Sequence, residues 1–391
     1  MTVIADSAAL AEFCRNQMRA DYVTVDTEFI RDNSYWPQLC VVQIAGPAEA
    51  ALIDPLVPGM DLQPILELLA NREVLKVFHA ARQDVEIFFH LTGRVPQPIF
   101  DTQVAAMVCG FGEQASLETL AQRLAGISID KSSRFTDWSH RPLSERQIRY
   151  ALDDVVHLRP IYERLREQLE QNRRASWLED EMALLTDPAT YRVDPGDAWR
   201  RLKVRAGKPR FLAVLKEVAA WREEEAQRRD MPRNRLIRDE ALLEIAAHAP
   251  TNVQDLARTR GLSRGVAEGR FGQGLIVAVE RALAKPEADW PKPEPKPILP
   301  QGLAPLIDLL RVLLKSKCEA AGVAQKLVAS AADLEAIAAD DQAEVPALTG
   351  WRRKLFGEDA LALKHGALAL SAKGNRISII PLKPKTREAA D

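Results

Sequence analysis

Short apolar runs alternate with stretches of helical spacing from residue 1 to about residue 110. Four runs are rich in Val and Ile and are broken by Gly, Pro or Asn, as strands are: YVTVDTEF, QLCVVQIA, AALIDPL and VLKVFHA. The first three follow one another without a helical insertion, which predicts an antiparallel meander. The segments DLQPILELLANR and ARQDVEIFFHLTG have helical spacing instead. This pattern predicts a mixed α/β sheet flanked by helices and argues against a doubly wound sheet.

The rest of the chain has the spacing of helices. Residues 115–172 are predicted to be helical apart from a loop at 130–142, and two helical blocks follow at about 209–283 and 303–363. The segment between the blocks, KPEADWPKPEPKPILP, is dense in proline. Because proline cannot continue a helix, this run predicts an extended linker between domains. Near the end, GALALSAKGNRISIIPL has apolar runs around Gly374-Asn375, the pattern of a small hairpin.

Length and composition narrow the class of protein. A chain of 391 residues exceeds the usual size of one hydrophobic core, so we expect two or three domains. No apolar run approaches the roughly 20 residues that a membrane span needs. The N-terminal segment MTVIADSAALAEFCRNQMRA lacks the basic start and the apolar core of a secretory signal, so we expect a cytoplasmic protein. The four cysteines form no CxxC pair, which argues against a zinc site or a disulfide framework.

Charge is unevenly distributed along the chain. The net charge of −2 predicts no nucleic-acid partner, but residues 191–238 contain 14 Lys and Arg against 7 Asp and Glu. This segment is either a candidate for contacts with phosphates or the solvated surface of a helix, and charge alone does not separate the two.

Two acidic residues interrupt the first predicted strand, DYVTVDTEFIRD. Because side chains alternate along a strand, Asp26 and Glu28 point the same way. Like charges side by side repel. A divalent cation such as Mg²⁺ neutralises this repulsion, because carboxylate oxygens are its preferred ligands. On its own, however, the D-x-E pattern favours a solvent-facing strand surface.

Further acids lie at two other positions of interest. Asp84 lies where a predicted strand runs into a helix, and functional residues gather at such ends, although a single acid there is usually a surface acid. In RPLSERQIRYALDDVVHLRPIY, Ser144 and Gln147 have the spacing of a capping box that starts a helix. Tyr150 and Asp154 lie four residues apart on that helix and so share one side. Helical spacing places Asp154 at the border of the apolar stripe and its neighbour Asp153 further toward solvent.

Taken together, these motifs resemble a known family. VDTEF, HAARQDVEIF and YALDD look like the three motifs of DEDD exonucleases of the tyrosine subclass, and DKSSRFTDWSHRPLSERQIRYALDDVVHL is similar to the corresponding segment of the ribonuclease D family. The segment PRFLAVLKEVAAWREEEAQRRDMPRNRLIRDEALLEIAAHAP resembles an HRDC domain. The later GWRRKLFGEDALALKHGALAL is similar to the divergent second HRDC-like module of that family.

The resemblance implies a domain order and an activity. We expect a ribonuclease H-like 3′-5′ exonuclease domain at 1–172, a connector at 173–207, an HRDC domain at 208–284, the linker at 285–301, an HRDC-like domain at 302–372, and a C-terminal strand and tail at 373–391. The implied activity is a metal-dependent 3′-to-5′ exoribonuclease. It would release nucleoside 5′-monophosphates from tRNA precursors and other structured RNAs, acting as a monomer with no membrane and no obligate protein partner.

The resemblance also implies a site. The metal ligands would be Asp26, Glu28, Asp84 and Asp154, holding two Mg²⁺ or Mn²⁺ ions about 4 Å apart. Tyr150 would hydrogen-bond the attacking water. A phenol with a pKa of about 10 is a poor base at neutral pH, so we expect it to orient that water.

Other residues lie near these motifs. Four of them, in the loop before the Tyr150 helix, are candidates for substrate contact: Lys131, Arg134, Trp138 and Arg141. An equally good alternative is that Trp138 packs and Arg141 pairs with an acid. Asp101 and the histidines His79 and His157 are expected to be structural.

Two other functions are possible. A DNA exonuclease uses the same chemistry, but the chain has no polymerase region and its HRDC arrangement argues against this. A catalytically inactive RNA-binding scaffold would have no use for clustered, repelling carboxylates.

Overall fold

The computed structural model describes residues 2–129, 136–204, 208–293 and 300–382. Its N-terminal part is a six-stranded sheet of order β1-β4-β3-β2-β5-β6. The strands are β1 (Thr2–Ile4), β2 (Tyr22–Ile30), β3 (Gln38–Ala45), β4 (Ala50–Ile53), β5 (Leu75–Phe78) and β6 (Ile99–Asp101). The meander β2-β3-β4 is antiparallel, whereas the pairs β2-β5, β5-β6 and β1-β4 are parallel. The expected mixed sheet is confirmed; β1 and β6, of three residues each, are too short for an alternating pattern to reveal them.

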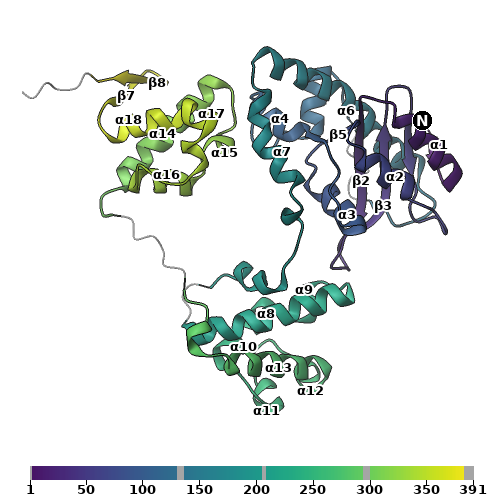
Figure 1. Ribbon diagram of the computed structural model, residues 1–391, viewed down its shortest axis with the longest axis vertical. Helices are drawn as coiled ribbons and strands as arrows, with labels where there is room; N and C mark the ends of the chain where they lie inside the picture. Colours follow the sequence, from purple (N-terminus) through teal and green to yellow (C-terminus); the bar gives the residue numbers. More distant parts are fainter. Residues whose placement is uncertain (1, 130–135, 205–207, 294–299, 383–391) are drawn as a thin grey trace, which may run out of the picture.

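Helices cover both faces of this sheet (Figure 1). On one face, α1 (Ser7–Gln17), α2 (Gln63–Ala70) and α3 (Arg82–Thr92) pack with Val23 and Val25 of β2. On the other face lies α6 (Glu145–Gln171), which packs against Val41 and Ala45 of β3. The predicted capping box starts α6: the Ser144 side chain accepts the backbone N–H of Gln147.

Short elements complete the part of the chain that precedes the helical modules. They are α4 (Thr102–Val108), α5 (Leu117–Leu120), η1 (Ala121–Ala125), η2 (Ala175–Leu178), α7 (Glu179–Thr186), η3 (Pro188–Thr190) and η4 (Pro195–Arg201).

Two helical modules and a hairpin follow, as the spacing predicted (Figure 1). The first module contains α8 (Pro209–Arg229), α9 (Arg233–Leu236), α10 (Asp239–His248), α11 (Val253–Leu256), α12 (Arg264–Glu268) and α13 (Arg270–Ala284), with the turn η5 (Glu287–Asp289) after it. The second contains α14 (Ala304–Ala321), α15 (Gln325–Val328), α16 (Ala331–Ala339), η6 (Pro346–Leu348), α17 (Gly350–Arg352), η7 (Arg353–Gly357) and α18 (Glu358–Lys364). The hairpin pairs β7 (Leu368–Lys373) with β8 (Arg376–Pro381), so its first strand begins inside the range expected for the second module. Residues 294–299 of the predicted linker lie outside the described residues.

Among the described helices, none combines the length and apolar character needed to cross a membrane.

The first helical module holds the loop between β2 and β3. Tyr35 of that loop is buried in the hydrophobic core of the module, and its hydroxyl donates to the Glu223 carboxylate. The backbone N–H groups of Tyr35 and Trp36 both donate to Asp230 Oδ1, at 3.0 and 2.9 Å. The strand β2 is therefore tied directly to this module.

The second helical module packs on η2 and α7, and it shares a hydrophobic core with α4 and α6 of the sheet domain. The rings of Trp177 and Trp351 stack with their centroids 4.2 Å apart. Arg352 donates to the carboxylates of Asp180 at 2.7 Å and Glu181 at 2.9 Å. Both modules thus contact the sheet domain through side chains that are far apart in the sequence.

Candidate active site

Three carboxylates converge on the face of the sheet that α6 covers. Asp26, Glu28 and Asp154 each offer one oxygen, and these oxygens lie within 4.8 Å of one another. Asp26 and Glu28 share a side of β2 because they are two residues apart, and Asp154 reaches them from α6. Asp154 is 7% exposed and the adjacent Asp153 is half-buried, so the helical spacing identified the more buried acid.

Asp84 approaches the cluster from α3, on the other face of the sheet. It lies in the first turn of α3, shortly after β5, the parallel neighbour of β2. Its Oδ1 accepts the hydroxyl of Thr27 at 2.5 Å, and its charge is near enough to raise the pKa of Asp26. The structure therefore places Asp84 beside the three converging carboxylates and does not include it among them.

Asp101 fixes the turn that carries Asp84. In this turn Ala80 has a φ of 59°, a left-handed conformation that costs a non-glycine residue about 1–2 kcal/mol. Asp101 accepts the backbone N–H groups of Ala80 at 3.0 Å and Ala81 at 2.9 Å, and it also caps α4 through the N–H of Gln103 at 2.8 Å. The structural role expected for Asp101 is confirmed.

The acids repel one another when no cation is bound. Burial raises the pKa of Asp26 well above its usual value, and the charges of Asp84, Asp154 and Glu28 raise it further. Burial also raises the pKa of Asp84 to about 7, against the opposing effect of the hydrogen bond from Thr27. A set of converging carboxylate oxygens that destabilise each other is the donor set that hard divalent cations bind. The residues present thus fit the metal that the family motifs imply.

Tyr150 lies one helical turn before Asp154, and its hydroxyl donates to the Asp154 carboxylate. Burial raises the pKa of this phenol above its ordinary value, and the negative charges of Asp154, Glu28 and Asp26 raise it further. Tyr150 is therefore protonated at neutral pH and acts as a hydrogen-bond donor.

The loop before α6 is held by packing and by ion pairing. Trp138 is 2% exposed, and its ring centroid lies 6.1 Å from that of Tyr150. Arg141 Nε lies 2.6 Å from Asp54 Oδ2. These are the contacts of the alternative in which both residues are structural. Two further candidates lie outside the described residues: Lys131 and Arg134.

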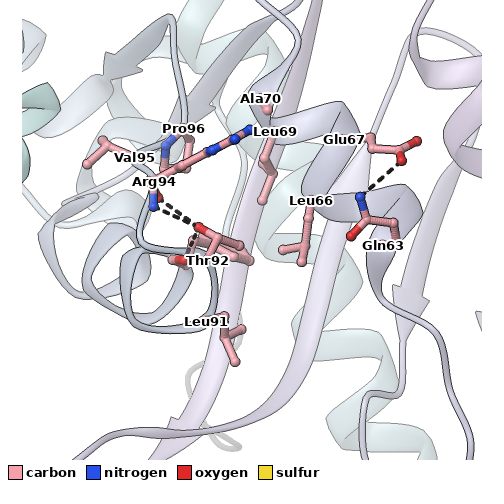
Figure 2. Close-up of a pocket in the computed structure, with 11 residues that line it drawn as sticks. Gln63, Leu66, Glu67, Leu69, Ala70, Leu91, Thr92, Arg94, Val95 and Pro96 are labelled. Atoms are coloured by element: carbon pink, nitrogen blue, oxygen red, sulfur yellow. Dashed lines mark hydrogen bonds between the residues drawn. The ribbon is translucent and has the colours of Figure 1, made fainter.

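The sheet domain also has a cavity of about 380 Å³ on its other face, between α2 and α3 (Figure 2). Gln63, Leu66 and Glu67 line it from α2, and Gln63 Nε2 donates to Glu67 Oε1 across one helical turn at 3.0 Å. Leu91 and Thr92 line it from the end of α3. None of the four predicted metal ligands lines this cavity, so it is separate from the acidic site.

Comparisons with known proteins agree with the geometry. A family model described as 3′-5′ exonuclease matches residues 1–170, and a model of the HRDC domain matches residues 211–279. A ribonuclease D of Granulibacter bethesdensis is 52% identical over 380 residues, covering 97% of this chain and 96% of its own. The chain belongs to the ribonuclease D family. It is therefore a hydrolase with 3′-5′ exoribonuclease activity.

Other members of the ribonuclease D family give the same result. A ribonuclease D of Gluconacetobacter diazotrophicus is 49% identical, covering 97% of this chain and 96% of its own. The crystal structure of Escherichia coli RNase D matches with a TM-score of 0.80 and 30% identity, covering 93% of this chain and 98% of that one. Ribonuclease D membership favours an exoribonuclease over a DNA exonuclease or an inactive scaffold.

Sequence reasoning missed two groups of residues in this member of the ribonuclease D family. The alternation of side chains along a strand predicts that Thr27 faces away from Asp26, but nothing in the sequence indicates that its hydroxyl meets Asp84. The second group is Tyr35 and Trp36: two adjacent aromatic residues in a short polar loop are a signal for burial against another domain.

Proposed function

We propose that this exoribonuclease removes nucleoside 5′-monophosphates from the 3′ ends of structured RNAs such as tRNA precursors. The E. coli RNase D that it resembles over nearly its whole length is described as an exoribonuclease involved in structured RNA processing. One observation carries the chemistry: three carboxylate oxygens within 4.8 Å of one another, beside a protonated tyrosine. Such a cluster suits hydrolysis of a phosphodiester at a metal centre.

We propose that Asp26, Glu28, Asp84 and Asp154 hold two Mg²⁺ or Mn²⁺ ions. Bound there, the ions would neutralise charge on the phosphate and acidify the attacking water. Asp26 and Glu28 offer their oxygens from β2, Asp154 from α6, and Asp84 from the first turn of α3. The Tyr150 hydroxyl, beside Asp154, would hydrogen-bond the attacking water and orient it, because its raised pKa prevents it from acting as a base.

We propose that the helical modules hold the RNA. The basic excess in residues 191–238 supports this, since contacts with phosphate depend on Lys and Arg. Part of the excess is neutralised within the protein: Arg233 pairs with Glu223 and Arg222 pairs with Asp239. Arg201 also lies near Glu223, with its Nη1 3.9 Å from Glu223 Oε1, but its side chain is 57% exposed and so remains accessible to RNA.

The domain boundaries predicted above remain part of the proposal. They are 1–172 for the exonuclease domain, 208–284 for the HRDC domain and 302–372 for a second HRDC-like domain. The helices α14 to α18 support the last range, although β7 begins within it. We propose that the protein acts in the cytoplasm as a monomer.

The test uses a 5′-labelled tRNA with a 3′ extension and a matched single-stranded DNA. We expect shortening of the RNA from its 3′ end with Mg²⁺ or Mn²⁺, stalling near the mature terminus, and no shortening with EDTA. Preferred digestion of the DNA would contradict the proposed substrate.

Two isosteric variants on α6 test the residue assignment. Asp154→Asn removes a converging carboxylate and should lower the turnover rate by at least about 100-fold without unfolding the protein. The control is Asp153→Asn, which removes the same charge one residue away and should retain the turnover rate. Near-normal turnover by Asp154→Asn would contradict the assignment.

A further inference from the structure

Gln43 of β3 lies directly opposite Asp26 in the sheet. The backbone register pairs Asp26 with Gln43. Side chains of directly opposed residues point to the same face of a sheet, with their Cβ atoms about 5 Å apart. Gln43 therefore shares the face that carries Asp26 and Glu28 and that α6 covers.

The Gln43 amide is buried without a hydrogen-bond partner. The residue is 0% exposed, and neither its Nε2 nor its Oε1 has a partner among the described residues. Its neighbours two positions away on β3 are Val41 and Ala45, and on β4 it lies opposite Leu52, all of them buried and apolar. An unpaired buried amide is costly and rare in natural proteins, and an apolar side chain of similar length would suit these neighbours better.

Polar groups of the same face limit what this amide can bind. The hydroxyl of Thr24, two residues before Asp26 on β2, already donates to the backbone carbonyl of Val155 at 2.7 Å. The carboxylate of Asp26 is the acceptor directly across the strand pair from Gln43. A carboxylate that binds a cation through one oxygen can accept a hydrogen bond at the other, and such bonds orient metal ligands.

We propose that Gln43 is a positioning residue: when cations occupy the site, its Nε2–H donates to the Asp26 carboxylate and fixes the orientation of that ligand. This inference rests on the proposed metal-dependent function. Gln43 contacts neither substrate nor cation in this arrangement. The amide is retained in an apolar environment because the hydrogen bond is made in the metal-loaded state.

The test replaces the amide by apolar groups in the full-length protein. Gln43→Met keeps an unbranched side chain of nearly the same length, and Gln43→Leu is a second variant of similar volume. The control is Gln17→Met: Gln17 is 3% exposed, also has an unpartnered amide Oε1, and lies on α1 on the other face of the sheet. The measurements are Mn²⁺ titration by calorimetry, thermal unfolding in EDTA and in Mn²⁺, and RNA shortening over a range of Mn²⁺ concentrations.

We expect the Gln43 variants to unfold in EDTA at the wild-type temperature or above it, since an unpaired polar group is removed. Their dissociation constant for Mn²⁺ should rise by about 10- to 100-fold, with turnover partly restored at high Mn²⁺, and Gln17→Met should bind Mn²⁺ like the wild type. Wild-type Mn²⁺ affinity in either Gln43 variant would overturn the inference, as would failure of both variants to fold in EDTA. Absence of Mn²⁺ binding and of RNA shortening in the wild type would overturn the proposed function itself, and the inference with it.

Discussion

The Tyr150 hydroxyl donates to Asp154, and burial holds the pKa of the phenol above its ordinary value. In the proposed mechanism this group orients a water and does not take its proton, so Tyr150→Phe should lower kcat by about 10- to 100-fold and leave measurable activity. Steady-state rates of RNA shortening across neutral pH measure this, with Asp154→Asn as the inactive reference. A Phe variant as inactive as Asp154→Asn would contradict the orienting role.

Lys76 is a second residue whose chemistry depends on burial. It is fully buried in β5, its Nζ donates to the backbone carbonyl oxygens of Asn71 at 2.6 Å and of Gln97, and burial lowers its pKa from 10.5 to about 7. Between these two pKa values the unfolded chain binds the proton that the folded protein has lost. Since the unfolded state then binds more protons, the contribution of Lys76 to the free energy of unfolding rises with pH through that window.

The measurement compares the wild type with Lys76→Met by urea unfolding at several pH values between about 7 and about 10. The free energy of unfolding of the wild type, relative to the variant, should increase by up to about 1.4 kcal/mol per pH unit. If the difference in the free energy of unfolding between the wild type and Lys76→Met does not change with pH, Lys76 keeps its proton on folding.

Among the elements, the junction between β5 and α3 determines where Asp84 lies. Asp101 accepts the backbone N–H groups of Ala80, Ala81 and Gln103 there. Asp101→Ala leaves these donors without that acceptor and should lower the free energy of unfolding by about 3 kcal/mol. Urea unfolding measures this loss, and Asp101→Asn, which keeps one acceptor oxygen, should lose less. An unchanged unfolding midpoint for the Ala variant would contradict this account.

At the scale of the whole molecule, the loop after β2 joins the exonuclease domain to the first helical module. The Tyr35 hydroxyl donates to Glu223 and accepts from Arg233 Nη2 at 2.8 Å and from Gln227 Nε2 at 3.2 Å. Tyr35→Phe removes these bonds at a buried site and should destabilise the protein by about 1–3 kcal/mol. Denaturant unfolding followed by tryptophan fluorescence measures this, since Trp36 reports on the same contact. Wild-type stability would show that the hydroxyl network contributes nothing to docking.

Prediction from sequence succeeded where a periodic pattern or a local motif was long enough to be recognised. The meander, the capping box at Ser144 and the choice of Asp154 over Asp153 all follow from spacing along one element. Sequence reasoning left open whether Trp138 and Arg141 bind substrate, and the structure instead shows packing and a pair with Asp54. Such contacts join residues far apart in the chain, where periodicity carries no information.

The sequence by itself predicted the longer strands and helices, the family resemblance and the four candidate acids, because each is encoded within one strand, helix or motif. Tertiary structure alone decided that three carboxylate oxygens lie within 4.8 Å of one another while Asp84 stands beside them bonded to Thr27. It also decided that the Gln43 amide is buried opposite Asp26. Strand register and the docking of α6 create these distances, and both depend on packing between segments that are far apart in the chain.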